Sequence, residues 1–267
     1  MQQTVWAMDG SFFAQRISGI QRYSIELLAA LDAIVPAGLV EIVVPQGVKT
    51  PAYTNIKVVP FGTRKGLAWQ QLDYPCYLKR RSAKGLATCN VIPWFGFTGI
   101  AVVHDVCYRA RRDFYRDTRR DRLSAAWHCL QYRRIAQKAE RIITVSEFSK
   151  AEIHKYYGVP PEKMNVVYNA WQQMQRIAPD DGVFARHPQL QKGGYYFSMA
   201  NLLKNKNFPW VLRAAKAKPD AMFAIAGGGS LAEEAGRLGL ADLPNVVYLG
   251  YVSDGEAKSL MANCRAF

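Results

Sequence analysis

The sequence lacks any long apolar segment. None of its 267 residues belong to a run of about 18 uncharged apolar residues, the length that a membrane-spanning helix needs. The amino-terminal stretch, MQQTVWAMDGSFF, has neither the basic region nor the apolar core of a secretory signal. We therefore expect a soluble protein that stays in the cytoplasm.

Cysteine is scarce and scattered. The sequence has five cysteines and no CxxC pair, and these five are Cys76, Cys89, Cys107, Cys129 and Cys264. An odd number without paired spacing predicts neither a disulfide framework nor a zinc site. A reducing cytoplasm fits this pattern.

Acidic residues are too few to balance the basic ones, which leaves a formal charge of +14. Most of the excess precedes residue 171, in the runs KRRSAK (79–84) and RARRDFYRDTRRDR (109–122). These runs could be solvated helix faces with i,i+4 ion pairs, or they could attract anionic lipid head groups or a polyanionic substrate. Nucleic acid is not expected as a partner, because the runs lack interleaved aromatic side chains.

Short β-rich runs alternate with helical patterns along the first part of the chain. We predict strands at Thr4–Met8, Val40–Val44, Ile56–Pro60, Cys89–Pro93, Ile100–His104, Arg141–Val145 and Lys163–Tyr168. We predict helices at Ile20–Leu31, Trp69–Lys79, Thr118–Lys138 and Ser149–Tyr157. This alternation predicts the α/β class, with a parallel sheet covered on both faces.

The pattern breaks in a polar stretch, AWQQMQRIAPDDGVFARHPQLQKGG (170–194), where we place an interdomain linker and a boundary between domains 1–170 and 171–267. It then restarts with strands at Tyr195–Met199, Ala221–Ala226 and Asn245–Leu249 and helices at Phe208–Lys216, Leu231–Leu238 and Asp254–Asn263. Both domains are therefore expected to be Rossmann-like and doubly wound. Three strands leave a sheet short of neighbours, so we expect the second domain to be incomplete.

Ligands of open parallel sheets bind beyond the carboxyl ends of the strands, so the loops there are the candidate sites. In ANLLKNKNF, Asn207 can cap the following helix, which places Lys204 and Lys206 at a helix amino end that attracts phosphate. The alternative is a surface lysine pair. Gly228, in the GGGS turn, allows close approach of a ligand, although a plain turn needs no ligand.

In the first domain, Gly19 and Arg22 open the helix after the first strand, and His104 and Asp105 end the apolar strand IAVV. A histidine at the carboxyl edge of a sheet is a candidate for chemistry, although a lone histidine is often structural. Ser146 could cap a helix or face a cleft. The pairs Ser149–Glu152 and Ser253–Glu256 have the spacing of capping boxes and are expected to be structural.

Five motifs in order resemble the family 4 retaining glycosyltransferases of bacterial polysaccharide assembly, which have the GT-B fold: RISGIQRY, VVHDVCY, RIITVSEFSKAEIHKYYGVPPEKMNVVYNA, YYFSMANLLKNKNFPWVLRA and NVVYLGYVSDGEAKSLMANCRAF. The resemblance implies an acceptor-binding domain followed by a nucleotide-sugar domain, with no metal and no other cofactor. Asn205 stands where the family usually has an arginine. The sequence also stops before the family's Glu-x7-Glu motif, so we expect a truncated chain with negligible transfer of its own.

Together these arguments assign the site residues. Resemblance and loop position predict His104 as catalytic, Arg22 and Asp105 as acceptor-binding, and as donor-binding Gly19, Asn201, Lys206, Asn207, Gly228, Tyr251 and Val252.

The function implied by the resemblance is transfer of a hexose or deoxyhexose, of the mannose or rhamnose type, from a nucleotide sugar to a glycan or lipid-linked acceptor with retention. Such a protein would work in polysaccharide or lipopolysaccharide assembly, in the cytoplasm or peripherally at the inner face of the cell membrane. A non-catalytic remnant or binding module is the alternative. An oxidoreductase is less favoured, because neither first turn has GxGxxG.

Overall fold

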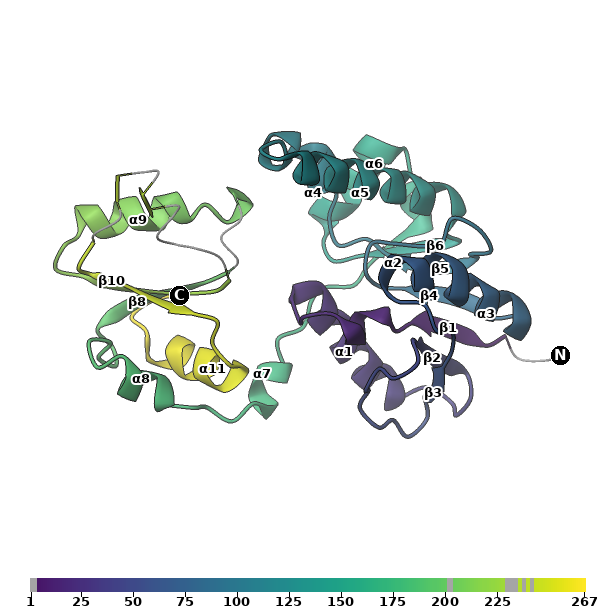
Figure 1. Ribbon diagram of the computed structural model, residues 1–267, viewed down its shortest axis with the longest axis horizontal. Coiled ribbons are helices and arrows are strands. Elements are labelled where there is room, and N and C mark those ends of the chain that lie inside the picture. Colours follow the sequence, from purple (N-terminus) through teal and green to yellow (C-terminus); the bar gives the residue numbers. More distant parts are fainter. Residues whose placement is uncertain (1–3, 201–203, 229–234, 237–238, 241–242) are drawn as a thin grey trace. The chain divides into compact units, whose positions relative to one another are not determined.

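The chain forms two units, Met1–Asn169 and Ala170–Phe267, which we call the amino-terminal and carboxy-terminal units (Figure 1). The computed structural model describes residues 4–200, 204–228, 235–236, 239–240 and 243–267. The boundary lies within one residue of the one expected from the sequence.

The amino-terminal unit is built on a seven-stranded sheet of order β3-β2-β1-β4-β5-β6-β7, in which every neighbouring pair is parallel. Its strands are β1 Trp6–Asp9, β2 Val40–Val44, β3 Lys57–Pro60, β4 Lys84–Ala87, β5 Gly99–Val102, β6 Arg141–Thr144 and β7 Met164–Val166. The strand order reverses between β1 and β4, which makes the carboxyl ends of these two strands the topological switch point.

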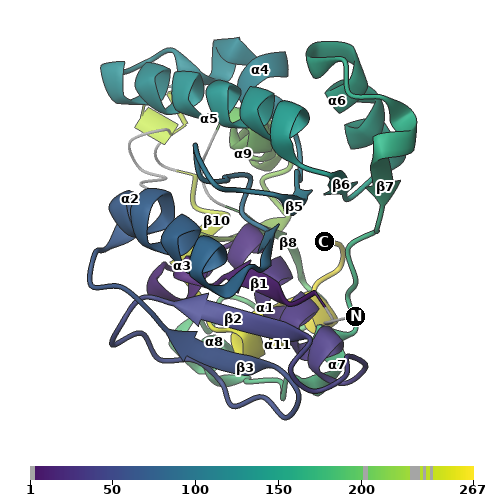
Figure 2. The same ribbon diagram turned by 90° about the vertical axis from the view of Figure 1, so that its right-hand side faces the viewer.

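Helices cover both faces of this sheet. They are α1 Gly19–Asp32, α2 Gly66–Ala68, α3 Tyr74–Arg81, α4 Cys107–Ala110, α5 Arg119–Lys138 and α6 Glu147–Tyr157, with the π-helix η2 Trp69–Asp73 and the 3-10 turns η1 Ser11–Ala14, η3 Arg112–Tyr115 and η4 Pro161–Lys163. Figures 1 and 2 show α5 and α6 together on the side away from α1. None of the helices in the described part of the chain combines the length and apolarity needed to cross a membrane.

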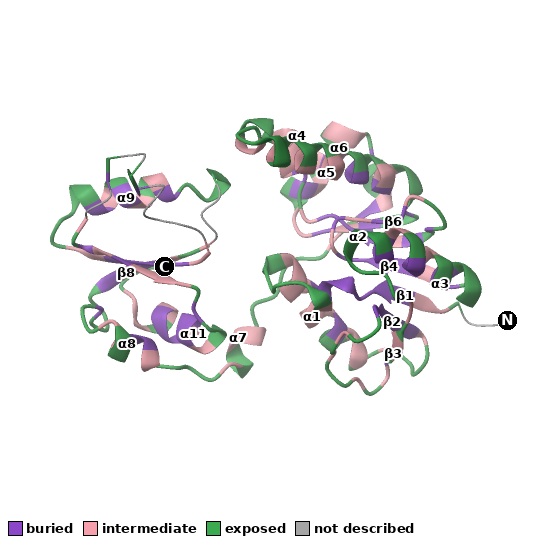
Figure 3. Cartoon of the chain, in the orientation of Figure 1, coloured by how far each residue is buried: buried purple, intermediate pink, exposed green. Residues whose placement is uncertain are grey.

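Successive strand residues face opposite sides, which gives the unit two apolar cores. Ala7 and Val43 belong to the core shared with α3, α5 and α6. Their strand neighbours Met8 and Ile42 belong to the core on the other face, together with Leu28 of α1. Figure 3 shows that many of the buried residues lie along the strands. Alternate side chains of the predicted strands at 4–8 and 40–44 therefore fill both cores.

The predicted strand at Cys89–Pro93 is wrong, because the strand at this place is β4, a few residues earlier. Gly85 of β4 allows the Phe97 ring to pack on the strand, where an added Cβ would lie 2.4 Å from that ring. The apolar stretch after β4 is a loop, in which the N–H of Ile92 donates to Gln131 Oε1 at 3.0 Å. Burial against α5, rather than pairing in the sheet, explains why that stretch is apolar.

The carboxy-terminal unit has a three-stranded parallel sheet of order β10-β9-β8. Its strands are β8 Tyr195–Met199, β9 Met222–Ala226 and β10 Val246–Gly250, and its helices are α7 Gln173–Arg176, α8 Gly182–Arg186, α9 Phe208–Ala217 and α11 Asp254–Asn263, with the 3-10 turn η5 Lys204–Lys206. Ala266 forms a parallel bridge with Tyr196 beside β8. Most of the helix expected at 231–238 lies outside the described residues. The expected class of two Rossmann-like units is confirmed by this topology.

The stretch predicted to be an interdomain linker is instead largely part of the carboxy-terminal unit. Val183 and Leu190 lie in its core with Tyr195 and Leu260. The polar residues that suggested a linker are on the exposed sides of α7 and α8. Because the stretch is polar on average, its sequence did not indicate that Val183 and Leu190 are buried.

The predicted capping boxes had different outcomes. Ser253 and Glu256 form one at the start of α11, as expected. The box expected at Ser149 is wrong, because α6 begins earlier and Ser146 is its N-cap, accepting from the N–H of Ser149. This also answers the open question about Ser146, whose hydroxyl caps a helix.

Candidate functional site

His104 follows β5 at the carboxyl edge of the amino-terminal sheet, and four contacts fix its position. Its Nε2 lies 2.9 Å from the carbonyl oxygen of Thr88, and its backbone N–H donates to Asn90 Oδ1 at 2.9 Å. The Tyr23 ring meets the imidazole edge-on, with centroids 4.8 Å apart. The backbone carbonyl of His104 accepts from Ser149 Oγ at 3.0 Å. His104 is therefore held by the loop after β4, by α1 and by α6, and its ring contacts the first two of these.

These contacts determine the protonation of His104. A carbonyl oxygen only accepts, so Nε2 carries the hydrogen and Nδ1 of the neutral ring is an acceptor. Burial lowers the pKa of His104, and the Thr88 carbonyl and the charge of Asp105 oppose this only in part. At neutral pH the side chain is a neutral imidazole that can accept a hydrogen bond from a hydroxyl group.

Helix α1 supplies the wall beside His104. Tyr23 contacts the imidazole, and the hydroxyl of the next residue, Ser24, lies 2.7 Å from Thr88 Oγ1. Gly19 is the first residue of α1, one turn before Tyr23, and a Cβ added there would meet nothing within 4 Å. The fold itself therefore does not require glycine at position 19. Arg22, in the same turn, is partly exposed.

Asp9 ends β1 at the switch point and is buried. Its carboxylate accepts from the N–H of Ser11 at 2.9 Å and from Gln70 Nε2 at 2.6 Å. Burial raises the pKa of Asp9 despite these bonds. Gln70 lies in the π-helix η2, and such short π-helical turns often occur at functional sites. Asp9 and Gln70 thus brace the loop that leads to α1.

Asp105 has a structural partner of its own. Its carboxylate accepts from the N–H of Cys107 at 2.8 Å, at the start of α4, and its side chain is exposed. The nearby Cys89 is not a nucleophile at neutral pH, because burial raises the pKa of its thiol to about 11. Of the polar groups at this edge, His104 has the clearest chemical capacity.

In the carboxy-terminal unit the candidate residues lie on loops after β8, β9 and β10. Lys206 is exposed in η5, directly before the amino end of α9. Cations are unfavourable at this end of a helix and anions are favourable, so the place suits a phosphate group. Asn207 occupies the N-cap position as predicted, but in a left-handed conformation with φ 52° and without a side-chain cap bond. The expected capping by its side chain is therefore wrong.

The glycine turn after β9 is built around Gly227 rather than Gly228. Gly227 has φ +143°, and a Cβ there would lie 1.7 Å from the carbonyl oxygen of Ala200. Its N–H donates to the Gly250 carbonyl at 2.7 Å, and its carbonyl accepts from Tyr248 Oη at 2.7 Å. Gly227 thus ties the ends of the three strands together, whereas Gly228 has open space where a Cβ would be.

The two residues after β10 differ sharply. Tyr251 is 65% exposed. Val252 is 9% exposed and packs in the core with Ala257 and Leu260. Its side chain is a core residue, so only its backbone could meet a ligand. Asn201, also predicted to bind the donor, lies outside the described residues.

The structure thus brings the predicted residues together in two sets. The first set lies at the carboxyl edge of the amino-terminal sheet and consists of Gly19, Arg22, His104 and Asp105. The second set lies on the loops after the strands of the carboxy-terminal sheet and consists of Lys206, Asn207, Gly228, Tyr251 and Val252. Sequence reasoning missed Tyr23, Ser24, Thr88, Asn90 and Asp9. A strand placed correctly at β4 would have pointed to Thr88 and Asn90, and the helical spacing from Gly19 would have pointed to Tyr23. Within the described residues, no group of three or more His, Cys, Asp or Glu side chains could hold a metal ion.

Comparison with solved structures shows the same fold. Sucrose-phosphate synthase from Thermosynechococcus elongatus is 12% identical, with a TM-score of 0.70 over 98% of this chain and 74% of that chain. Anabaena HepE in complex with UDP-glucose is 16% identical, with a TM-score of 0.63 over 98% and 72%. A glycosyltransferase from Rickettsia africae is 12% identical, with a TM-score of 0.58 over 99% and 72%.

At the level of sequence, no curated protein is significantly similar to the chain. The profile of Glycosyltransferase Family 4 matches residues 17–171, which is more than half of the chain. The matched range starts just before Gly19 and includes His104 and the whole of α5. The GT-B relationship expected from the motifs therefore holds for the fold, and the protein belongs to glycosyltransferase family 4.

Proposed function

We propose that the protein transfers a hexose or deoxyhexose, of the mannose or rhamnose type, from a nucleotide sugar to a glycan or a lipid-linked acceptor. The observation that carries the proposal is His104, a neutral hydrogen-bond acceptor held at the carboxyl end of β5 inside the range matched by the family. Sugars are recognised through their hydroxyl groups, and Nδ1 of this ring can accept from one. A cytoplasmic role in polysaccharide or lipopolysaccharide assembly is part of the proposal.

Residues of each unit, taken by itself, suit a part of the nucleotide sugar. Lys206 and the amino end of α9 suit the diphosphate, Tyr251 suits the base, and Gly19 leaves room for a phosphate beside α1. Anabaena HepE was solved with UDP-glucose, which supports a nucleotide-sugar donor for a protein of the same fold. Arg22 and Asp105 are assigned to the acceptor side.

The proposed reaction retains the configuration at the anomeric carbon. The acceptor oxygen bonds to this carbon on the face that the diphosphate leaves, the carbon–oxygen bond to the diphosphate breaks, and a phosphate oxygen takes the acceptor's proton. Lys206 and the helix amide groups would stabilise the charge that grows on the diphosphate. His104 would hold a hydroxyl of the transferred sugar, and no metal is assigned to the reaction.

A binding module without transfer is the second candidate. The observation that favours it is Asn205, an exposed neutral residue where related proteins usually have an arginine. One charge fewer at the diphosphate would weaken both binding and stabilisation of the leaving group. A module of this kind would bind nucleotide and acceptor without releasing nucleoside diphosphate.

The experiment that tests the proposal uses the full-length protein with a panel of nucleotide sugars and measures release of nucleoside diphosphate in the presence of glycan and lipid-linked acceptors. Release with one donor class, together with retention seen by NMR of the product, supports transfer. Nucleotide binding without release by any donor supports the binding module. Inversion at the anomeric carbon would contradict the proposed mechanism.

A further inference from the structure

We propose that the side-chain amide of Asn90 donates a hydrogen bond to a hydroxyl group of a sugar substrate, beside the hydroxyl that His104 accepts from. The inference rests on the proposed function and deepens it, because it adds a specificity-determining residue to the site. Asn90 belongs to the loop after β4, which borders the topological switch point. Ligands of open parallel sheets usually bind at this point.

Asn90 has an unusual backbone conformation. Its φ of 60° lies in the left-handed region, which side chains other than glycine seldom adopt. Two other described non-glycine residues have a positive φ, and both stand at helix ends, where Ser82 follows α3 and Asn207 precedes α9. Asn90 is part of no helix. Conformations of this kind cluster at functional sites, and here the conformation accompanies a contact of the side chain with His104.

The contact with His104 determines which way the amide of Asn90 points. The backbone N–H of His104 lies 2.9 Å from the Asn90 side chain. Because an N–H group only donates, the atom that faces it is the oxygen Oδ1. The nitrogen Nδ2 is bonded to the same carbon as Oδ1. Nδ2 is therefore turned away from this N–H, but it stays close to His104.

Nδ2 is the part of this amide that a ligand can satisfy. Asn90 is 5% exposed, and in the described part of the chain no acceptor contacts its Nδ2. Nδ2 is not one of the atoms that are sealed in the interior without a partner, so a ligand can reach it. Leaving a largely buried donor unpaired is unfavourable. A ligand that offers an acceptor to Nδ2 therefore gains binding free energy.

Other polar side chains at this edge are bonded within the protein. The hydroxyl oxygens of Ser24 and Thr88 lie 2.7 Å apart, and Gln70 Nε2 donates to Asp9. By contrast, Asn90 Nδ2 offers a donor and His104 Nδ1 offers an acceptor on two residues in contact. This combination matches two hydroxyl groups of one sugar ring, because a hydroxyl can either accept or donate.

The loop holds Asn90 in place on its carboxy-terminal side as well. The N–H of Ile92 donates to Gln131 Oε1, and the N–H of Trp94 donates to Gln71 Oε1, both at 3.0 Å. A donor that is already ordered loses little conformational entropy when a ligand binds. It also discriminates against a sugar without the matching hydroxyl, because it is then left unpaired. Asn90 is thus suited to sugar specificity.

The test is NMR spectroscopy of the isotope-labelled full-length protein, in which the side-chain amide signals of Asn90 are those that Asn90→Asp removes. The probes are GDP-mannose, dTDP-rhamnose, methyl mannopyranoside and GDP alone. We expect a nucleotide sugar to shift these signals if the hydroxyl belongs to the transferred sugar. We expect methyl mannopyranoside to shift them if it belongs to the acceptor. GDP alone should leave them in place.

The variant Asn90→Asp separates sugar binding from positioning of His104. Aspartate keeps an oxygen that accepts from the His104 N–H and tolerates the left-handed conformation, but it offers no N–H to a ligand. We expect it to bind the sugar about tenfold more weakly, which is the effect of losing one hydrogen bond. A residue that only positions His104 would leave the affinity unchanged.

The matched control is Asn165→Asp, which makes the same chemical change at an exposed position of β7 and should bind like the wild type. If Asn90→Asp unfolds, Asn90→Gly provides the second measurement, because glycine readily adopts a positive φ. This variant should also bind the sugar more weakly.

Three results would overturn the inference. The first is a sugar that shifts other signals of the protein and leaves those of Asn90 in place. The second is an equal shift with GDP alone, which would assign the amide to a phosphate. The third is wild-type affinity of Asn90→Asp. If nucleoside diphosphate is released while the Asn90 signals stay in place, the inference fails alone. If no probe shifts any signal and no release occurs, the proposed function fails and the inference fails with it.

Discussion

The two units place their candidate residues in opposite environments. In the amino-terminal unit, His104 is fixed by Thr88, Asn90 and Tyr23 before any ligand binds. In the carboxy-terminal unit, Lys206 and Tyr251 stand exposed on loops after short strands. The difference indicates that the first set of residues is held in place by the fold, whereas the second set is exposed and would take its final shape from a ligand, as proposed. The predictions below test this comparison, from the largest expected effect to the smallest.

The largest effect should come from the core of the carboxy-terminal unit. Leu212 of α9 is 1% exposed, and truncation to Ala should lower the free energy of unfolding by about 2–5 kcal/mol. Trp210, two residues earlier on the same helix, is largely exposed, so Trp210→Ala should change the free energy of unfolding by less than about 0.5 kcal/mol. Denaturant unfolding monitored by circular dichroism measures both. Equal losses would mean that α9 does not pack as described.

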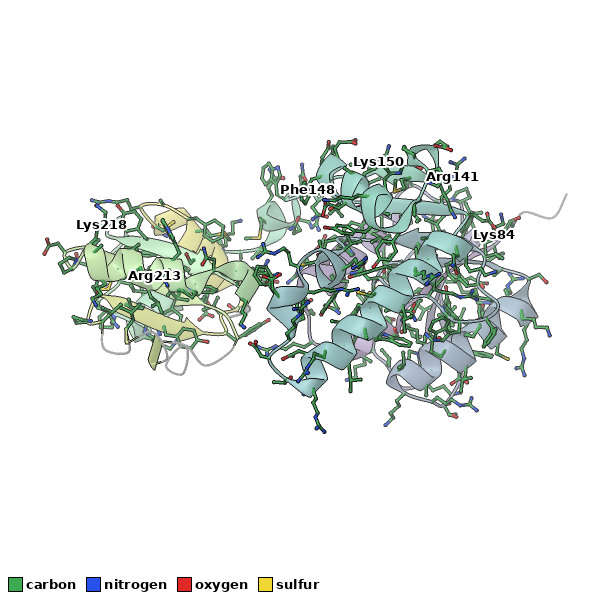
Figure 4. The ribbon with its side chains drawn as sticks, turned by 90° about the horizontal axis from the view of Figure 1, so that it is seen from above. Lys84, Arg141, Phe148, Lys150, Arg213 and Lys218 are labelled. Carbon is green, nitrogen blue, oxygen red and sulfur yellow. The ribbon has the colours of Figure 1, made fainter. Side chains whose placement is uncertain are left out.

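The next effect concerns the charge at the second site. Lys206→Ala should weaken nucleoside diphosphate binding by about 1.5–3 kcal/mol, the contribution of a charge-assisted hydrogen bond. Lys218, at the other end of α9, is the control, and Lys218→Ala should leave affinity unchanged (Figure 4). Titration calorimetry measures both affinities. If the two variants bind alike, Lys206 is a surface lysine and the diphosphate assignment is wrong.

A smaller effect should appear in the pH dependence of the first site. Because burial lowers the pKa of His104, the unfolded chain takes up this proton first as the pH falls through about 6.5. The contribution of His104 to stability is therefore present above that pH and is lost below it. The rate of transfer should stay level through pH 6.5 and decline only at lower pH. Tyr23→Ala exposes the ring and should move the decline upward, and an unchanged profile would argue against burial as the cause.

The smallest effect on stability should be at Gly19. Since a Cβ there meets nothing, Gly19→Ala should leave the free energy of unfolding within about 0.5 kcal/mol of the wild type. The Michaelis constant for the donor should nevertheless rise if a phosphate approaches this backbone. Gly10→Ala is the contrasting variant, because its Cβ would lie 2.6 Å from the Val43 carbonyl oxygen and should destabilise the fold. If Gly19→Ala leaves the Michaelis constant for the donor unchanged, Gly19 is not part of the site.

The sequence predicted the architecture well because the information is local. β2, β8 and α11 have the predicted bounds, since alternation, turns and the Ser253 cap lie within a few residues of one another. The loop after β4 was misread as a strand because an apolar run does not reveal what covers it. In this structure a side chain of α5, Gln131, satisfies its backbone.

The candidate site was predictable only in part for the same reason. His104 is recognisable at the end of an apolar strand, but its partners Thr88 and Asn90 are 16 and 14 residues away. Tyr23 is even further from His104 in the sequence, and it lies on α1. Such contacts depend on strand order, which periodicity does not specify. Likewise, the burial of Val252 depends on how α11 packs, so a family motif alone suggested a ligand contact there.

The most direct test of the account is nucleoside diphosphate release by the full-length protein and by His104→Ala. His154 is the control, because its ring lies at the end of α6 against the Val159 carbonyl and has no place in the proposed site. We expect the wild type and His154→Ala, each expressed at the full natural length of the protein, to release nucleoside diphosphate from one class of nucleotide sugar. We expect His104→Ala to be slower by about 100-fold or more, with an unchanged unfolding transition. Equal rates for all three proteins would contradict the claim that His104 lies at the centre of the transfer site.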